Sequence, residues 1–236
     1  FLPGGGGTGS YDIAPNFSAT RNYANVTKLA LSIDQVHRTT REMRRAFHTA
    51  RQGRPGPVLV EMHGDVLRHE VPENTPPYKA SSAMKSAPSR SDIKDAVAQL
   101  LAADAPVIWA GQGVLYAEAA DQLKELAELT QTPVITTMQA KSVFPDDHPL
   151  ALGSANRTAP KSVFKWLGAA DTVFAVGSGL TRTTFGIDIP PGKFMIQANV
   201  AAEDINKDYD IDIGLVGDAK LTLELMIDEI KGTVGE

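Results

Sequence analysis

The strongest constraint on the fold is a repeated alternation of helical segments and short apolar strands from residue 91 to the C-terminus. Such alternation predicts an α/β domain, in which helices on both faces cover an open, Rossmann-like parallel sheet. The predicted elements are helix Ser91–Ala103, strand Pro106–Gly111, helix Ala117–Thr130, strand Pro133–Met138, helix Pro160–Gly168, strand Thr172–Gly177, strand Lys193–Val200, a short strand at Ile213–Val216 and helix Ala219–Lys231.

The first part of the chain contains a single predicted α/β unit. Residues 1–33 show no clear period, and a helix is expected to begin at Ser32, where Gln35 completes a capping box. Gly53 ends this helix, and Val58–Met62 follows as a buried strand. One helix and one strand cannot cover both faces of a parallel sheet, so we expect an incomplete domain. The predicted apolar face of the helix comprises Val36, Met43, Ala46, Phe47 and Ala50.

The composition between the two parts indicates a linker, because residues 68–90 are rich in Pro, Ser, Asn and Lys and show no period. We therefore predict an incomplete domain at 1–66, a linker at 67–90 and a complete domain at 91–236. The N-terminal stretch "FLPGGGGTG" has no initiator Met and no signal-peptide core, which suggests a fragment.

Composition excludes several classes of function. The 236 residues include no cysteine, which excludes disulfides, thiolate metal sites and a cysteine nucleophile. The net charge of -5 and the lack of a basic patch argue against nucleic-acid binding. The longest apolar runs are too short to cross a bilayer. We expect a cytoplasmic protein that binds neither nucleic acid nor membrane.

Candidate ligand-binding residues follow the predicted strands, because open parallel sheets bind ligands at the carboxyl ends of their strands. The glycines could admit a diphosphate to backbone N–H groups, or could serve only tight turns and close packing. The threonine hydroxyls could equally bond the backbone. These candidates are Gly111, Gln112, Gly113, Thr136, Thr137, Met138, Gly177 and Gly179.

Other polar motifs favour structural roles. "GGGGTG" (Gly4–Gly9) lacks a preceding strand and is predicted to be a flexible loop. Asp65 and Asp218 are expected to be turn or helix N-cap residues. The histidines have no metal-ligand spacing, so we expect surface or local hydrogen bonds. An arginine-rich helix face is either solvated or pairs with an acidic partner domain, and comprises Arg41, Arg44 and Arg45.

The ordered set of motifs resembles thiamine-diphosphate enzymes of the acetolactate synthase type. "ARQGRPGPVLVEMHGDV" is similar to the end of their pyrimidine-binding domain. "PVIWAGQGV" and "ELAELTQTPVITTMQAKSVFPDDHPLALG" resemble the start of the central domain, and "GAADTVFAVGSGL" and "DIGLVGDAKLTLELM" its later part. The resemblance extends from Asn16 to the C-terminus.

The resemblance implies a parent enzyme that makes or breaks a carbon–carbon bond next to a carbonyl, as in decarboxylation of a 2-oxo acid. Such enzymes use thiamine diphosphate and Mg²⁺. A glutamate of the pyrimidine-binding domain helps to turn the thiazolium into a carbanion, and a third domain holds Mg²⁺ and the diphosphate through a Gly-Asp-Gly…Asn motif. "HGDV" and "VGDA" each lack the second Gly and the Asn. The chain alone is therefore expected to be inactive, and its partners to be the missing parts of the polypeptide and a second subunit, in a homodimer or homotetramer.

The resemblance also bears on the central domain, which binds FAD in acetolactate synthases, ADP in oxalyl-CoA decarboxylases and nothing in many members. FAD binders carry an Arg where this chain has Gly179, and Asp-Ile-Asp where it has Asn199, Val200 and Ala201. "GQG" and "TTM" still suit an adenosine diphosphate along the strand ends. Asn199 therefore joins the candidate residues. The alternatives are a scaffold domain of the enzyme and a self-standing FAD- or adenine-nucleotide-binding module.

Overall fold

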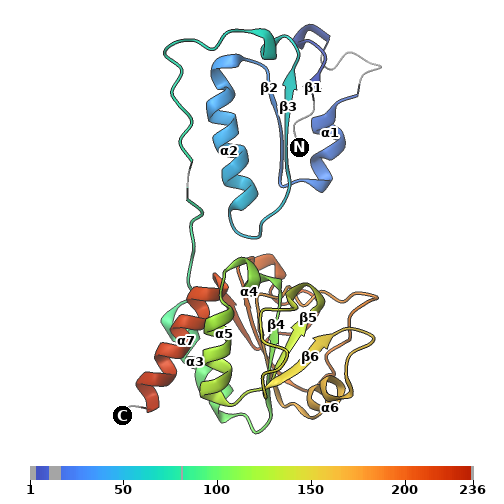
Figure 1. Ribbon diagram of the computed structural model, residues 1–236, viewed down its shortest axis with the longest axis vertical. Coiled ribbons are helices and arrows are strands. Elements are labelled where there is room, and N and C mark those ends of the chain that lie inside the picture. Colours follow the sequence, from blue (N-terminus) through green and yellow to red (C-terminus); the bar gives the residue numbers. More distant parts are fainter. Residues whose placement is uncertain (1–3, 11–16, 81, 235–236) are drawn as a thin grey trace. The chain divides into compact units, whose positions relative to one another are not determined.

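The computed structural model describes residues 4–10, 17–80 and 82–234. The chain divides into two compact units, Phe1–Met84 and Lys85–Glu236, and each is considered by itself (Figure 1).

The larger unit contains a six-stranded, fully parallel sheet with the strand order β6-β5-β4-β7-β8-β9. The chain adds strands outward from β4 in one direction, and then returns to the other side of β4 with β7. The strands are β4 (Pro106–Ala110), β5 (Val134–Thr137), β6 (Ala151–Ala155), β7 (Thr172–Val176), β8 (Phe194–Asn199) and β9 (Ile213–Val216).

Alternating side chains give this sheet two apolar faces, and both are covered. Ile108, Phe174 and Ile196 point to one face, where they pack against helices α3, α5 and α7. Val107 and Val173 point to the other, where helix α6 and the long loop after β7 cover them. Figure 1 shows α3, α5 and α7 together on one side of the sheet and α6 on the other. The predicted α/β architecture is confirmed.

Two helices of this unit begin at a side-chain cap. The Ser89 hydroxyl accepts from the Asp92 N–H at the start of α3, and the Asp218 carboxylate accepts from the Lys220 and Leu221 N–H groups at the start of α7. The predicted cap at Asp218 is therefore confirmed. The helices are α3 (Arg90–Ala102), α4 (Gln112–Tyr116), α5 (Ala120–Thr130), α6 (Lys161–Ala169) and α7 (Ala219–Val234).

Two details of the larger unit differ from the sequence prediction. The helix expected at Ala117–Thr130 begins only at Ala120, because Glu118 has a left-handed φ of 55°, and the short helix α4 before it was not predicted. Strand β6 was not expected, since its sequence "ALGSA" lacks β-branched residues.

The smaller unit contains a three-stranded parallel sheet in the order β1-β3-β2. Its strands are β1 (Gly4–Gly5), β2 (Leu29–Ile33) and β3 (Val58–His63), and its helices are α1 (Ala19–Tyr23) and α2 (Thr39–Arg51). Helices α1 and α2 lie on opposite sides of the sheet (Figure 1). Short 3-10 helices occur in both units at Thr8–Ser10, Ala24–Val26, Val36–Arg38, Val66–Arg68, Met138–Ala140 and Ala202–Asp204.

Three predictions for the smaller unit were wrong. Ser32 does not cap a helix but lies in β2, and α2 begins only at Thr39. Gly4–Gly5 is not a flexible loop but pairs with β3. Phe47, expected on the buried face of α2, is half exposed and packs on Tyr78 with 5.9 Å between the ring centroids. Met43 and Ala46 do pack in the small core beneath α2.

Two polar contacts fix the glycine-rich segment to the end of β3. The Gly6 carbonyl lies 3.1 Å from His63 Nδ1, which must donate because a carbonyl oxygen can only accept. Asp65 Oδ2 accepts from the Thr8 N–H at 2.9 Å and from the Thr8 hydroxyl at 2.5 Å. Asp65 Oδ1 also accepts from the Val66 N–H, which confirms the predicted cap.

Among the described residues, no helix combines the length and the apolar character that a membrane span requires.

We predict that Asp65 makes stability depend on pH. Hydrogen bonds from the Thr8 hydroxyl and backbone lower the pKa of Asp65 from 3.8 to about 2. The folded state therefore binds this proton less readily than the unfolded state, so the stabilisation is complete well above pH 3.8 and is lost as the pH falls toward 2. Urea unfolding of D65N should show lower stability at pH 7 and a flatter decline between pH 5 and 2.5. A decline as steep as in the unchanged chain would contradict the assignment.

Candidate site at the carboxyl ends of the central sheet

The candidate site lies where the strand order of the larger sheet reverses. Strands β4 and β7 are neighbours in the sheet, but their connections leave in opposite directions. In open parallel sheets, this reversal opens a crevice at the carboxyl ends of the strands, where ligands commonly bind. All six strands are parallel, so the fold brings the predicted residues after β4, β5, β7 and β8 to the same edge.

At this reversal, the loop after β4 and the loop after β7 meet backbone to backbone. The Gly113 N–H donates to the Gly177 carbonyl at 2.8 Å, and the Gly111 N–H donates to the Val176 carbonyl at 2.8 Å. A Cβ atom on Gly111 would lie 2.3 Å from the Gly177 oxygen, and one on Gly177 would lie 2.6 Å from the Val114 nitrogen. Gly177 also has a left-handed φ of 63°. These three glycines are therefore required by the contact between the loops.

This glycine contact (Gly111, Gly113 and Gly177) limits the backbone groups that could hold a diphosphate. The N–H groups of Gly111, Gly113 and Val114 already donate to protein carbonyls. Helix α4 has only five residues, so the dipole at its N-terminus is weak. The part of the chain that the structure describes thus fits a diphosphate poorly at this point of the crevice.

The loops after β7 and β8 are joined by a buried polar network that the sequence did not predict. The Gln197 amide nitrogen donates to the carbonyls of Ser178 (3.1 Å) and Asp204 (3.0 Å), and Gln197 Oε1 accepts from the Asn206 N–H (3.3 Å). Gln197 is buried in β8. A single glutamine within the apolar run "KFMIQANV" was the available signal, since a buried amide must find partners.

Gly179 and Asn199 belong to the same group of loops. A Cβ on Gly179 would meet the Asp204 carboxylate at 3.2 Å, and that buried carboxylate pairs with Lys207 Nζ at 2.8 Å. Asn199 Oδ1 accepts from the Ala201 N–H at 3.0 Å. Both residues thus have local structural partners, and their contact with a ligand stays a prediction.

The end of β5 is the more open part of the site. The Thr136 hydroxyl lies 3.0 Å from the Ser154 hydroxyl and is buried. Thr137 is half-buried and Met138 is 55% exposed. Gln112 is half-buried in α4. Among the described residues, the side chains of Gln112 and Thr137 form no hydrogen bond with the protein, so both suit a polar ligand group.

The two Gly-Asp pairs and three of the five histidines take structural roles. Asp65 and Asp218 are both occupied as caps. His63 bonds Ser32 and Gly6, His69 bonds the Asp65 carbonyl, and His148 bonds Glu128 at 3.1 Å. No group of His, Asp or Glu within the described ranges is arranged to hold a metal ion.

Comparison with known families decides the assignment. The profile for "Thiamine pyrophosphate enzyme, central domain" matches residues 93–226, which is more than half of the chain. The chain belongs to the thiamine pyrophosphate enzyme family. The predicted resemblance is therefore confirmed, and the larger unit corresponds to the family's central domain.

The sequence relatives agree with this assignment. A glyoxylate carboligase of Escherichia coli O157:H7 is 36% identical over 206 residues, which are 86% of this chain and 35% of the relative. An acetolactate synthase of Mycobacterium bovis is 33% identical over 225 residues, 94% of this chain and 36% of the relative. The chain thus spans about a third of the length of these relatives.

Solved structures share the fold. A putative thiamin diphosphate-dependent enzyme from Mycobacterium smegmatis superimposes with a TM-score of 0.80 at 22% identity, over 97% of this chain and 45% of that one. Benzoylformate decarboxylase from Polynucleobacter necessarius superimposes with a TM-score of 0.74 at 23% identity, over 86% of this chain and 38% of that one.

We predict that the glycine contact is a major source of stability in the central domain. G177A should lower the free energy of unfolding by about 3 kcal/mol or more, because backbone strain and overpacking add. Gly192 is the matched control, since its φ is 82° but no atom lies within 4 Å of a Cβ there. G192A should cost only about 1 kcal/mol. Chemical denaturation measures both, and equal losses would show that the loop contact contributes nothing.

Proposed function

We propose that the chain is part of a thiamine-diphosphate-dependent enzyme that makes or breaks a carbon–carbon bond next to a carbonyl, acting on a 2-oxo acid. The observation that carries this proposal is the central-domain match over residues 93–226. The names of the relatives, a carboligase and acetolactate synthases, point to the same chemistry. Thiamine diphosphate would supply the nucleophile for such a reaction, and Mg²⁺ would hold its diphosphate.

The role proposed for this chain is scaffolding. We assign residues 1–66 to the end of the pyrimidine-binding domain, 67–90 to a linker and 91–236 to the central domain. The central sheet is rigid because both of its faces are buried, so it can hold catalytic domains in a fixed orientation. The enzyme is expected to be a cytoplasmic homodimer or homotetramer with the cofactor between subunits, an expectation compatible with a chain without cysteine.

The test uses the longest reading frame that contains this sequence. Its purified product should release CO₂ from pyruvate or glyoxylate only when thiamine diphosphate and Mg²⁺ are both present. The 236-residue chain, assayed in parallel, should show no turnover and no heat of thiamine diphosphate binding by calorimetry. Turnover without the cofactor, or cofactor binding by the chain alone, would contradict the proposal.

We further propose that an adenine nucleotide or flavin would contact the central domain at the end of β5. The support is geometric: Gln112 and Thr137 have unused polar groups, and Met138 offers an exposed apolar surface beside them, since α4 contacts the 3-10 helix that begins at Met138. The glycine contact and Asn199 would border this site rather than bind the diphosphate through their own N–H groups.

Thermal shift measurements test the nucleotide proposal. ADP or FAD at 1 mM should raise the unfolding temperature of the chain by several degrees if the dissociation constant is about 10 µM, since saturation at 100-fold excess adds about 2.7 kcal/mol. T137V should lose most of this shift, whereas T136V should keep it but lower the basal unfolding temperature. An unchanged unfolding temperature with both nucleotides would identify the central domain as a scaffold without a nucleotide.

A further inference from the structure

Helix α2 exposes arginines but buries its one acidic side chain. Thr39–Arg51 contains four arginines and a single carboxylate, Glu42. The Glu42 side chain is only 3% exposed, whereas Arg41 and Arg45 are 57% and 58% exposed. Solvated helix faces commonly alternate charges of opposite sign, and α2 does not. In a chain with a net charge of -5, this helix is therefore an unusual cationic surface.

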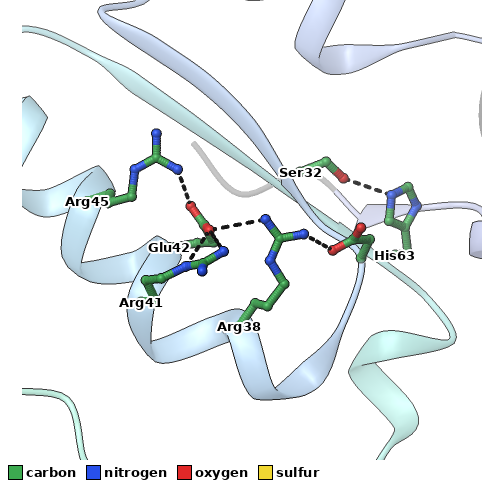
Figure 2. A network of polar contacts seen from close by, with 7 residues as sticks. Ser32, Arg38, Arg41, Glu42, Arg45 and His63 are labelled. Carbon is green, nitrogen blue, oxygen red and sulfur yellow. Dashed lines mark hydrogen bonds and ion pairs between the residues drawn. The ribbon is translucent and has the colours of Figure 1, made fainter.

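Three guanidinium groups surround the buried carboxylate (Figure 2). Arg41 donates to Glu42 Oε1 through Nε at 3.0 Å and through Nη2 at 2.8 Å, and Arg45 donates to Oε2 through Nη1 at 2.7 Å. Arg38 lies 3.5 Å from Oε1 and also pairs with Asp34 at 2.9 Å. Glu42 therefore joins the side chains of Arg41 and Arg45 through both of its oxygens.

The buried carboxylate holds these arginines in place. Burial alone would raise the pKa of Glu42, but hydrogen bonds from Arg41 and Arg45 outweigh burial and leave the pKa below its usual value. Glu42 thus stays ionised near neutral pH, and charge-assisted hydrogen bonds fix both guanidinium planes. A ligand that binds here loses little affinity to side-chain ordering, because Arg41 and Arg45 are already ordered.

Arg41 and Arg45 are placed to contact one ligand together. They lie about one turn apart on α2, and each already touches an oxygen of the same carboxylate. A guanidinium group has five N–H donors, of which Glu42 accepts two from Arg41 and one from Arg45. The exposed side chains of both arginines therefore keep N–H groups that Glu42 does not use, within reach of a single anion.

We propose that Arg41 and Arg45 form a binding site for a phosphate group, which we call the arginine site. One guanidinium fork satisfies a carboxylate, whereas a phosphate group has three terminal oxygens and can accept from two arginines at once. Arg38 adds a third positive charge beside them, which Asp34 shares. The occupant is free phosphate or the phosphate of a small ester, since both present these oxygens.

Arg44 separates the arginine site from a general cationic surface. It is exposed on the same helix and carries the same charge, but within the described structure it makes no ion pair with Glu42. A ligand attracted only by the net charge of α2 would respond equally to the loss of Arg44, Arg41 or Arg45. A ligand held by the arginine site would respond to Arg41 and Arg45 but not to Arg44.

Nuclear magnetic resonance of the nitrogen-15-labelled chain tests the arginine site. Inorganic phosphate, exchanged for chloride at constant ionic strength, should shift the Nε–H signal of Arg41 and nearby signals of α2 along a saturable curve. Constant ionic strength removes the general screening effect of salt. Shifts that fail to saturate, or that spread evenly over the chain, would overturn the proposal. Acetate should bind at least about tenfold more weakly, because it forms fewer charge-assisted hydrogen bonds, and equal binding of acetate would overturn the assignment to phosphate.

Substitutions that change charge equally locate the ligand on α2. R41Q should weaken phosphate binding about tenfold, since a charge-assisted hydrogen bond is lost. R44Q removes the same charge and should change the dissociation constant less than about twofold, because exposed charges are screened. R41K/R45K keeps the charge but replaces the planar forks, and should weaken binding about threefold or more. Equal affinities of R41Q and R44Q, or unchanged affinity of R41K/R45K, would refute the arginine site.

E42Q distinguishes preorientation from simple attraction. This substitution removes a negative charge, so charge alone would strengthen phosphate binding. Loss of the ionised carboxylate should instead release the arginines and weaken binding about threefold or more, because the ligand must then order them. Tighter binding by E42Q would contradict the role assigned to Glu42. Circular dichroism establishes that each variant is folded, and R41K/R45K decides if E42Q is not.

A phosphate ester distinguishes the two sources of the phosphate group. Glycerol 3-phosphate presents the same terminal oxygens on a small organic group. Binding at least as tight as that of inorganic phosphate would identify a phosphorylated metabolite as the occupant, and weaker binding would identify the free ion. Failure of both probes to bind would overturn the proposal.

Discussion

The central domain depends on one constraint: a parallel sheet with two apolar faces must be covered on both sides. Alternating residues such as Ile108 and Val107 point to opposite faces of β4, and each face has its own buried cluster. The backbone contact of Gly111 and Gly113 with the loop at Val176 and Gly177 joins the two loops at the point where the strand order reverses. Because glycine alone permits that approach, sequence and topology are linked most tightly there.

The smaller unit has less apolar burial than the central domain. Its described strands form a sheet of three, and its buried apolar cluster is limited to Ile33, Ala46, Val60 and Val66 with their partly buried neighbours. Polar groups contribute much of the remaining order, through Ser32 and His63 on one face and Glu42 in α2. Because this buried cluster is small, burial stabilises the unit only modestly, and the hydrogen bonds and ion pairs add to it.

The sequence predicted the architecture well where helices and strands had strong periods. Strands β4, β7 and β8 and helices α3 and α7 lie within a few residues of their predicted ends, because alternation of apolar helices with Val- and Ile-rich strands has few other solutions. It failed for β6 and β1, whose residues are small, since tertiary pairing rather than propensity makes them strands. It also assigned Ser32 to a helix cap because the capping-box pattern was present, although pairing with Glu61 places this residue in β2.

The sequence predicted where the candidate site lies, but not which of its polar groups are available to a ligand. Parallel topology fixes that residues after β4, β5 and β7 share one edge. Which of their groups remain available is decided by contacts between distant residues, such as Gly113 with Gly177 and Gln197 with Ser178. Local sequence carries no information about such pairs, so a glycine that packs a loop and a glycine that binds a phosphate look alike.

The central claim is that Lys85–Glu236 holds two extensive buried clusters, whereas Phe1–Met84 holds a single small one and is the less stable unit. Native-state hydrogen exchange of the chain, followed by mass spectrometry, measures this most directly. Amides of β4, β7 and β8 should exchange only through global unfolding of their unit, and those of β2 and β3 at least tenfold faster. Equal or slower exchange in β2 and β3 would contradict the account.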